Sequence, residues 1–155
     1  MKWMGKVIVI VIVFVCFCFS GLFSCGFYCP SGTKDIPEEI KTLLGPEWTK
    51  WVISRVDEIE YTTEENLLKE VGAGGKDYYG LATVEFCVKC EHTMCSTCCY
   101  RKILIDKQQP PFIIALVLIH EAAHHSTPER ENCNLASEKQ ALETEWRWTF
   151  GYPPP

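Results

Sequence analysis

The sequence lacks an excess of basic residues. Its 155 residues include 15 Lys and Arg against 20 Asp and Glu, which gives a formal net charge of −5. Proteins that bind nucleic acid normally present a basic face that displaces counterions from phosphate, so we expect no nucleic-acid partner. Internal repeats and low-complexity tracts are also absent, and the chain is too short for more than one modest domain. We therefore expect one core and one active site.

Charged residues are missing from a long N-terminal stretch. The run Val7 to Phe23 follows Lys2 and Lys6 and contains no charge. Such a run is typical of an export signal or a membrane anchor, and the lysines stay on the cytoplasmic side. We predict a signal peptide or membrane anchor over 1–24 and an extracytoplasmic, membrane-anchored domain after it.

The end of this run resembles the lipobox of bacterial lipoproteins, in which a Leu and two smaller residues precede an acylated Cys. Leu22, Ser24 and Cys25 fit that pattern, whereas Phe23 is bulkier than usual. The resemblance implies lipidation at Cys25, and an uncleaved anchor helix is the alternative. Residues 25–34 contain Pro, Ser and Gly without periodicity and are predicted to be a tether.

The remaining residues, 35–155, predict an α+β domain. A β-hairpin is expected from the strands Tyr78 to Lys89 and Tyr100 to Ile105, with a cysteine-rich loop over 87–99. Apolar spacing, caps and breakers predict five helical stretches: Asp35 to Gly45, Glu47 to Ile59, Glu64 to Val71, Phe112 to His124 and Asn134 to Phe150.

One motif carries recognisable chemistry. His120, Glu121 and His124 form HExxH at the end of an apolar helix. Histidines four residues apart lie about 40° apart around a helix, so both rings can reach one metal ion. Zinc would acidify a water and polarise a carbonyl, while Glu121 takes the proton and passes it to the leaving group. The alternative is a helix whose histidines are merely on its surface.

A catalytic zinc site needs a third protein ligand and an open fourth position. The downstream candidates are Glu129, Glu131, Cys133, Glu138, Glu143 and Glu145. On a helical projection Glu138 and Glu145 share a stripe with Leu142, while Glu143 falls on the opposite, polar face. Unpaired charge within an apolar stripe is costly, so we predict Glu138 as the ligand and Glu145 as its neighbour that orients the site. If the two carboxylates lie at the border of the stripe, they are only solvated.

With these residues the sequence resembles the gluzincins, zinc metallopeptidases in which a Glu from a following helix completes HExxH. The segment Glu138-Lys139-Gln140-Ala141 matches the Glu-x-x-Ala pattern of many small members. The resemblance implies a small zincin-like domain in which a short mixed sheet precedes the two site helices and a hairpin strand pairs with extended substrate. It covers about Tyr78 to Phe150. Several gluzincins carry an Asp near the position of Leu142, so the first histidine must be oriented from elsewhere, with Glu145 as the candidate.

Other polar residues near the motif are less easily assigned. His125 points away from the HExxH face and is predicted to be a neighbour and not a ligand. A side chain that stabilises the oxyanion is expected, and Tyr100, Arg147 and Tyr152 remain open candidates.

The cysteines form a cluster, with an even number of members available to it: Cys87, Cys90, Cys95, Cys98, Cys99 and Cys133. Outside the cytoplasm this count favours three disulfides, while the paired CxxC units leave structural zinc as an alternative. A redox CxxC lacks its usual strand-to-helix setting. With either disulfides or zinc, the cluster would stabilise a small domain by cross-linking it.

Two functions follow from these observations. The first is a membrane-tethered zinc peptidase with a peptide or protein substrate outside the cytoplasm. The second is a non-catalytic binding or immunity lipoprotein whose metal site is structural or vestigial. An open coordination position favours the first, and closure by Cys133 would favour the second.

Overall fold

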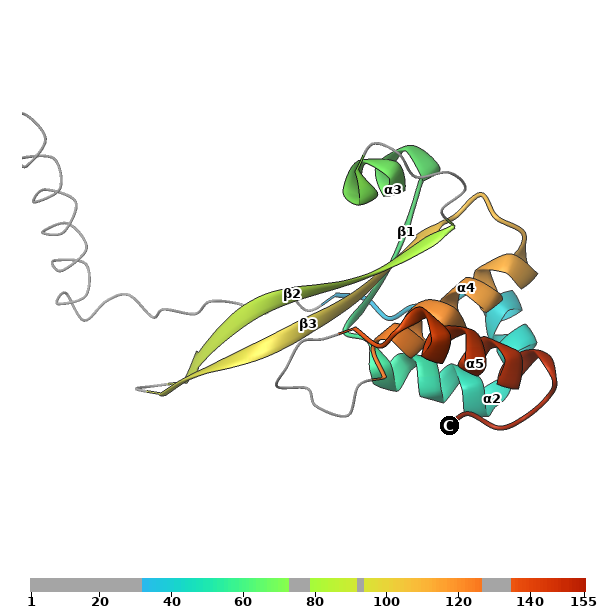
Figure 1. Cartoon of the computed structure of the whole chain (residues 1–155). Helices are drawn as coiled ribbons and strands as arrows, with labels where there is room; N and C mark the ends of the chain where they lie inside the picture. The colour runs from blue at the N-terminus through green and yellow to red at the C-terminus, as the bar shows by residue number, and fades with distance from the viewer. Residues whose placement is uncertain (1–31, 73–78, 92–93, 127–134) are drawn as a thin grey trace, which may run out of the picture.

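The structure is a computed structural model that describes residues 32–72, 79–91, 94–126 and 135–155, with the backbone alone over 86–98. These residues form a mixed α+β arrangement of four helices and a three-stranded sheet, as the sequence predicts at that level (Figure 1). The elements are α2 (Glu38–Arg55), β1 (Glu58–Thr62), α3 (Glu64–Val71), β2 (Gly80–Glu91), β3 (Met94–Asp106), α4 (Pro111–His124) and α5 (Glu138–Thr149).

Helix α2 consists of two helical pieces joined at a kink. Gly45 has φ 74°, a conformation that suits glycine, and Pro46 follows it inside the helix. The predicted break at this dipeptide is therefore confirmed. The predicted extension of the second piece to Ile59 is wrong, because the helix ends at Arg55 and a strand begins at Glu58.

The sheet is mixed, with strand order β1-β3-β2. The central strand β3 pairs in parallel with β1, where Ile59 faces Ile103, and antiparallel with β2, where Ala82 faces Ile103. Strand β2 is therefore an edge strand, and backbone groups on its outer side have no partner strand within the described sheet. Helix α3 contacts β2 and β3 and lies apart from the other helices (Figure 1).

The predicted hairpin exists, but its cysteines do not lie in a loop. Strands β2 and β3 continue to Glu91 and Met94, and the backbone register places Cys87 opposite Cys98 and Cys90 opposite Cys95. The prediction of a cysteine-rich loop over 87–99 is therefore wrong. The cysteines of each CxxC unit are three positions apart, so they do not show the two-residue alternation that is typical of a strand. Backbone pairing between β2 and β3 nevertheless keeps these residues extended.

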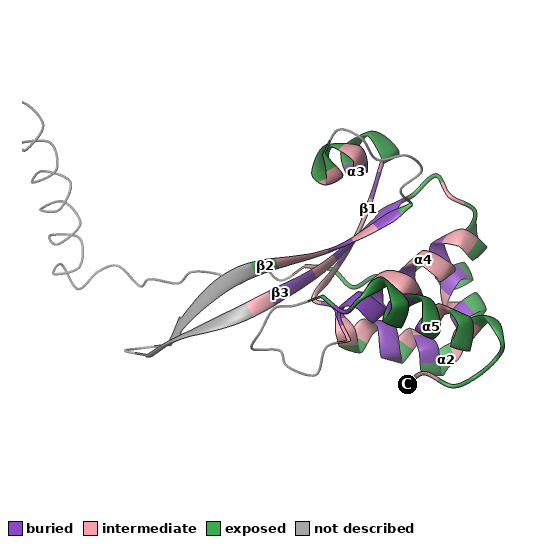
Figure 2. Cartoon of the chain, in the orientation of Figure 1, coloured by how far each residue is buried: buried purple, intermediate pink, exposed green. Residues whose placement is uncertain are grey.

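The core lies between the sheet and the helices α2 and α4. Helix α4 is buried along most of its length, with Ala115, Leu118 and Ile119 fully covered. It packs against α2 on one side and α5 on the other, and also touches β2 and β3. Figure 2 shows the contrast with α5, whose outer surface is largely exposed. The central position of α4 holds its C-terminal end, and hence the HExxH residues, in a fixed place.

The N-terminal predictions lie outside the described residues. The signal peptide or anchor over 1–24, Cys25 and most of the tether over 25–34 precede Gly32, the first described residue. Within the described part of the chain, no helix is long and apolar enough to cross a membrane.

Candidate metal centre

The two motif histidines face the same point from the last turns of α4. Their Nε2 atoms lie 3.3 Å apart, and the rings meet edge to face with centroids 5.0 Å apart. Both side chains are largely covered, with 19% of His120 and 10% of His124 exposed. The helix begins after Pro110 with Pro111 in its first turn, which suits the fixed φ of proline, and its apolar body anchors it in the core.

Helix α5 brings a carboxylate to this point. One oxygen of Glu138 lies 3.3 Å from His120 Nε2, and the other lies 3.4 Å from His124 Nε2. Glu138 is the first residue of α5, directly after the N-cap Ser137, and Ser137 and Gln140 form a reciprocal capping box. The cap fixes where the helix begins and therefore where the Glu138 carboxylate lies.

Each histidine uses its second ring nitrogen to contact a fixed acceptor. His120 Nδ1 lies 3.0 Å from Glu145 Oε2, and His124 Nδ1 lies 2.7 Å from the carbonyl oxygen of Ala136. In the tautomer with hydrogen on Nδ1, each ring donates to its acceptor and presents the Nε2 lone pair to the other histidine and to Glu138. Such partners are usual for histidines that ligate metal, because they set both tautomer and ring orientation.

The spacing of these atoms can be compared with the geometry that zinc requires. Zinc–nitrogen bonds of 2.0–2.1 Å at tetrahedral angles place neighbouring ligand atoms about 3.3 Å apart. The separations between His120 Nε2, His124 Nε2 and the nearest Glu138 oxygens are 3.3, 3.3 and 3.4 Å. His120, His124 and Glu138 form the candidate metal-binding group among the described residues. The two distances to Glu138 end on different carboxylate oxygens, so these three side chains surround one point where a metal ion such as zinc could be held.

Glu121 lies beside this group, against the edge strand β2. A Cβ added to Gly80 would come 3.2 Å from Glu121 Cγ and 2.2 Å from Val117 Cγ1, so the start of β2 lies close against α4. Burial raises the pKa of the Glu121 carboxyl, although His120, His124 and a hydrogen bond from the Ala82 backbone act in the opposite direction. A carboxylate with a raised pKa is suited to accept a proton near neutral pH.

His125 is fully buried and contacts the sheet, whereas the sequence predicted only that it points away from the face of the other two histidines. Its Nε2 donates to the Lys102 carbonyl over 3.2 Å, and Arg101 Nη1 donates to the His125 carbonyl over 2.7 Å. Burial lowers the pKa of His125 to about 4, so the ring is neutral at neutral pH. These contacts tie the C-terminal end of α4 to β3 and help to fix the rotation of the helix.

The prediction that Leu142 and Trp146 form the buried face of α5 is wrong, although Glu138 and Glu145, which were chosen on that basis, do lie beside the histidines. Leu142 is 47% exposed and Trp146 is 63% exposed, while Ala141 and Thr144 form the buried face of α5. Small residues allow α5 to approach α4 closely. Glu138 and Glu145 lie at the border of the buried face and contact the histidines.

The sequence predicts that Glu145 orients the site and that Glu143 lies on the polar face of α5, and the structure gives the location of each. Glu145 lies beside His120, and Glu143 is exposed and lies 3.8 Å from Lys139. The other ligand candidates, Glu129, Glu131 and Cys133, lie outside the described residues.

Two of the three oxyanion candidates are engaged in other contacts. Tyr100 is buried and donates its hydroxyl hydrogen to Glu58 over 2.7 Å. Arg147 donates to the Pro153 carbonyl from the exposed side of α5, and Tyr152 follows it in the tail. The choice among these three residues stays a prediction.

For the cysteine cluster the structure adds one observation. Cys99 is disulfide-bonded. The side chains of Cys87, Cys90, Cys95, Cys98 and Cys133 lie outside those described, so the pairing of the cluster stays a prediction.

Sequence reasoning missed three contributors to the site. The carbonyl of Ala136 and the β2 edge at Gly80 and Ala82 are backbone features without a residue-type signal. The start of α5 did have one, because Ser137-x-x-Gln140 is a capping-box pattern immediately before the helix. The predicted cap at Asn134 lies three residues before the observed N-cap, Ser137.

No family model, curated protein or solved structure matches the chain.

Proposed function

We propose that this protein is a membrane-tethered zinc peptidase that acts outside the cytoplasm and has a zincin-like domain. One observation carries the proposal: the Nε2 atoms of His120 and His124 and the carboxylate of Glu138 meet at one point, with neighbouring atoms 3.3–3.4 Å apart. The membrane tether and the location rest on the charge-free run Val7 to Phe23 and on Cys25.

In this proposal the residues of the site have separate roles in metal binding, orientation and proton transfer. His120, His124 and Glu138 hold the metal, and Glu145 keeps His120 in the tautomer that ligates through Nε2. Zinc, when bound, acidifies a water and polarises the carbonyl of the substrate. Glu121, beside the two histidines, would accept a proton from the attacking water and return it to the leaving amine.

A peptide is the substrate class that the surroundings favour. Strand β2 is an edge strand and lies against Glu121 at Gly80 and Ala82. An extended peptide can add to such an edge through main-chain hydrogen bonds, and this would carry its carbonyl groups past the base. Support for a peptidase over other zinc hydrolases comes from this strand.

The proposal can be tested with the full chain in detergent micelles, loaded with zinc and incubated with a mixture of peptides of varied sequence. Mass spectrometry of the products should reveal cleavage that stops when a zinc chelator is added and resumes with zinc. Glu121→Gln should retain zinc but lose at least about a hundredfold in rate, because an amide cannot take the proton.

Two results would count against the peptidase. If Glu121→Gln cleaves as fast as the unchanged chain, the activity does not come from this site. If the chain binds one zinc at the site and cleaves no peptide, the non-catalytic lipoprotein is the better function.

A further inference from the structure

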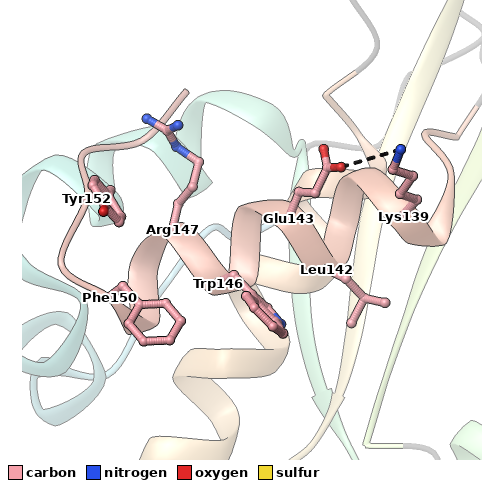
Figure 3. Close-up of a pocket in the computed structure, with 7 residues that line it drawn as sticks. All are labelled: Lys139, Leu142, Glu143, Trp146, Arg147, Phe150 and Tyr152. Carbon is pink, nitrogen blue, oxygen red and sulfur yellow. Dashed lines mark ion pairs between the residues drawn. The ribbon is translucent and has the colours of Figure 1, made fainter.

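The outward face of α5 and the tail after it carry an apolar surface that the metal site does not use. Of the eight large apolar side chains exposed among the described residues, only Leu43 and Tyr79 lie clearly away from α5 and its flanks. The other six are Phe112, Leu135, Leu142, Trp146, Phe150 and Tyr152. We call the four that lie together, Leu142, Trp146, Phe150 and Tyr152, the α5 patch. With Lys139, Glu143 and Arg147 they line a hollow of about 720 Å³. Figure 3 shows these seven side chains on α5 and the tail.

The α5 patch is held in shape by the tail. Arg147 donates from Nε and Nη2 to the Pro153 carbonyl over 3.2 and 3.1 Å. Gly151, with φ 74°, turns the chain back, and the Tyr152 N–H donates to the Arg147 carbonyl. Trp48 of α2 donates its indole N–H to the Tyr152 carbonyl. The four apolar side chains are therefore presented together on a folded surface.

The charge at the α5 patch is opposite to that of the chain. Lys139 lies 3.8 Å from Glu143, so Arg147 gives the lining one net positive charge, whereas the whole chain has a net charge of −5. Trp and Tyr beside Arg and Lys are the residues that collect at the boundary between lipid headgroups and acyl chains. Cations at the rim would also be attracted to anionic headgroups.

The length of chain before the domain adds an independent argument. Residues 24–31, eight in number, separate the charge-free run ending at Phe23 from Gly32. Fully extended, they span at most about 30 Å, and the distance is shorter if Cys25 carries the lipid. A domain tethered this closely meets the bilayer continually, so a modest apolar surface is enough for docking.

We propose that the α5 patch docks on the lipid bilayer to which the N-terminus is tethered. The proposal rests on the membrane tether and not on the peptidase activity. A second copy of the chain is the less favoured occupant, because a stable dimer uses roughly 20–30 residues on each side and this hollow is lined by seven. Docking would place the outer face of α5 on the lipid and leave its other face to the metal site.

The test uses the full chain reconstituted in vesicles of phosphatidylcholine and phosphatidylglycerol. One lipid is brominated near the top of its acyl chains, where it quenches tryptophan at the interface. The chain and its Trp146→Phe variant are compared, because the difference in their fluorescence isolates Trp146 while an aromatic ring stays in the α5 patch. We expect the bromolipid to quench about half of the Trp146 signal.

A matched pair of variants then tests the surface. Phe150→Ser should reduce the quenching of Trp146 severalfold, since it removes apolar area from the α5 patch. Leu43→Ser on α2, which changes a side chain of comparable class and 43% exposure away from that surface, should leave the quenching unchanged. Arg147→Glu should reduce the quenching more in anionic vesicles than in phosphatidylcholine alone.

Three other outcomes would each contradict the docking proposal, and each has a different cause. A chain that floats with the vesicles but shows no quenching of Trp146 is tethered but not docked. A chain that does not float has no anchor, and the docking proposal fails with it while zinc binding and cleavage are unaffected. Cross-linking between copies through α5, without quenching, would assign the surface to a dimer.

Discussion

Replacement of Glu145 by Ala should weaken zinc binding about tenfold to thirtyfold. The reason is the 3.0 Å contact between His120 Nδ1 and Glu145 Oε2, which fixes the ring in the ligating tautomer and orientation. Loss of such a partner typically weakens metal affinity by about 10- to 100-fold, or about 1.4–2.7 kcal/mol. The Glu145 side chain is 22% exposed, so water partly replaces the lost acceptor and the lower part of that range applies.

Two further variants separate the charge from the contact. Glu145→Gln keeps an oxygen that can accept from Nδ1, and a neutral acceptor bonds about half as strongly as a carboxylate, so the expected loss is about threefold. Glu143→Ala removes a carboxylate two residues away that is 64% exposed and lies 3.8 Å from Lys139. Zinc affinity of this control should stay within about twofold of the unchanged chain.

Affinity is measured by competition against a chromophoric zinc chelator, with the full chain in detergent micelles. Free thiols are titrated in the same samples, because reduced cysteines bind zinc and would mask the site. The reasoning is refuted if Glu145→Ala binds zinc as tightly as the unchanged chain. It is also refuted if Glu143→Ala loses the metal, since α5 would then present a different face.

Three other predictions follow from the described contacts. Ser137→Ala should destabilise the fold by about 1 kcal/mol through loss of the N-cap, measured by urea unfolding, and should weaken zinc binding because Glu138 loses its fixed place. Gly80→Ala should displace β2 and slow peptide cleavage, since its Cβ would lie 2.2 Å from Val117 Cγ1; recovery on adding Val117→Ala would identify the clash as the cause. Reduction should lower the free energy of unfolding by about 2–4 kcal/mol, because Cys99 is disulfide-bonded; an unchanged unfolding midpoint would show that the bridge does not stabilise the domain.

Elements with strong local signals were predictable from sequence. Helix α3 was predicted with its observed bounds, since acidic residues begin it and Gly72 ends it. Helix α4 follows from its apolar composition after Pro110, and the four-residue spacing of His120 and His124 already requires that the rings share a face. The α+β class follows from these elements and the hairpin.

Features that depend on distant contacts were not predictable in the same way. Strand β1 is five residues long and exists through parallel pairing with β3, more than forty positions later in the chain. The prediction of the inward face of α5 is wrong because large apolar side chains, such as Trp146, were expected to lie on it. Close packing on α4 instead selects Ala141 and Thr144, and leaves Trp146 outside.

Three consecutive residues, Ala136 to Glu138, each contribute to the candidate metal centre. The carbonyl of Ala136 contacts His124, Ser137 caps α5, and Glu138 belongs to the candidate metal-binding group. Helix ends fray more readily than helix centres. The first turn of α5 can therefore open while the histidines stay on the rigid helix α4. Metal exchange would then follow the kinetics of helix-end fraying, so that ion uptake and release need no unfolding of the domain. Strengthening the cap should lengthen the residence time of the ion on the protein without changing any ligand.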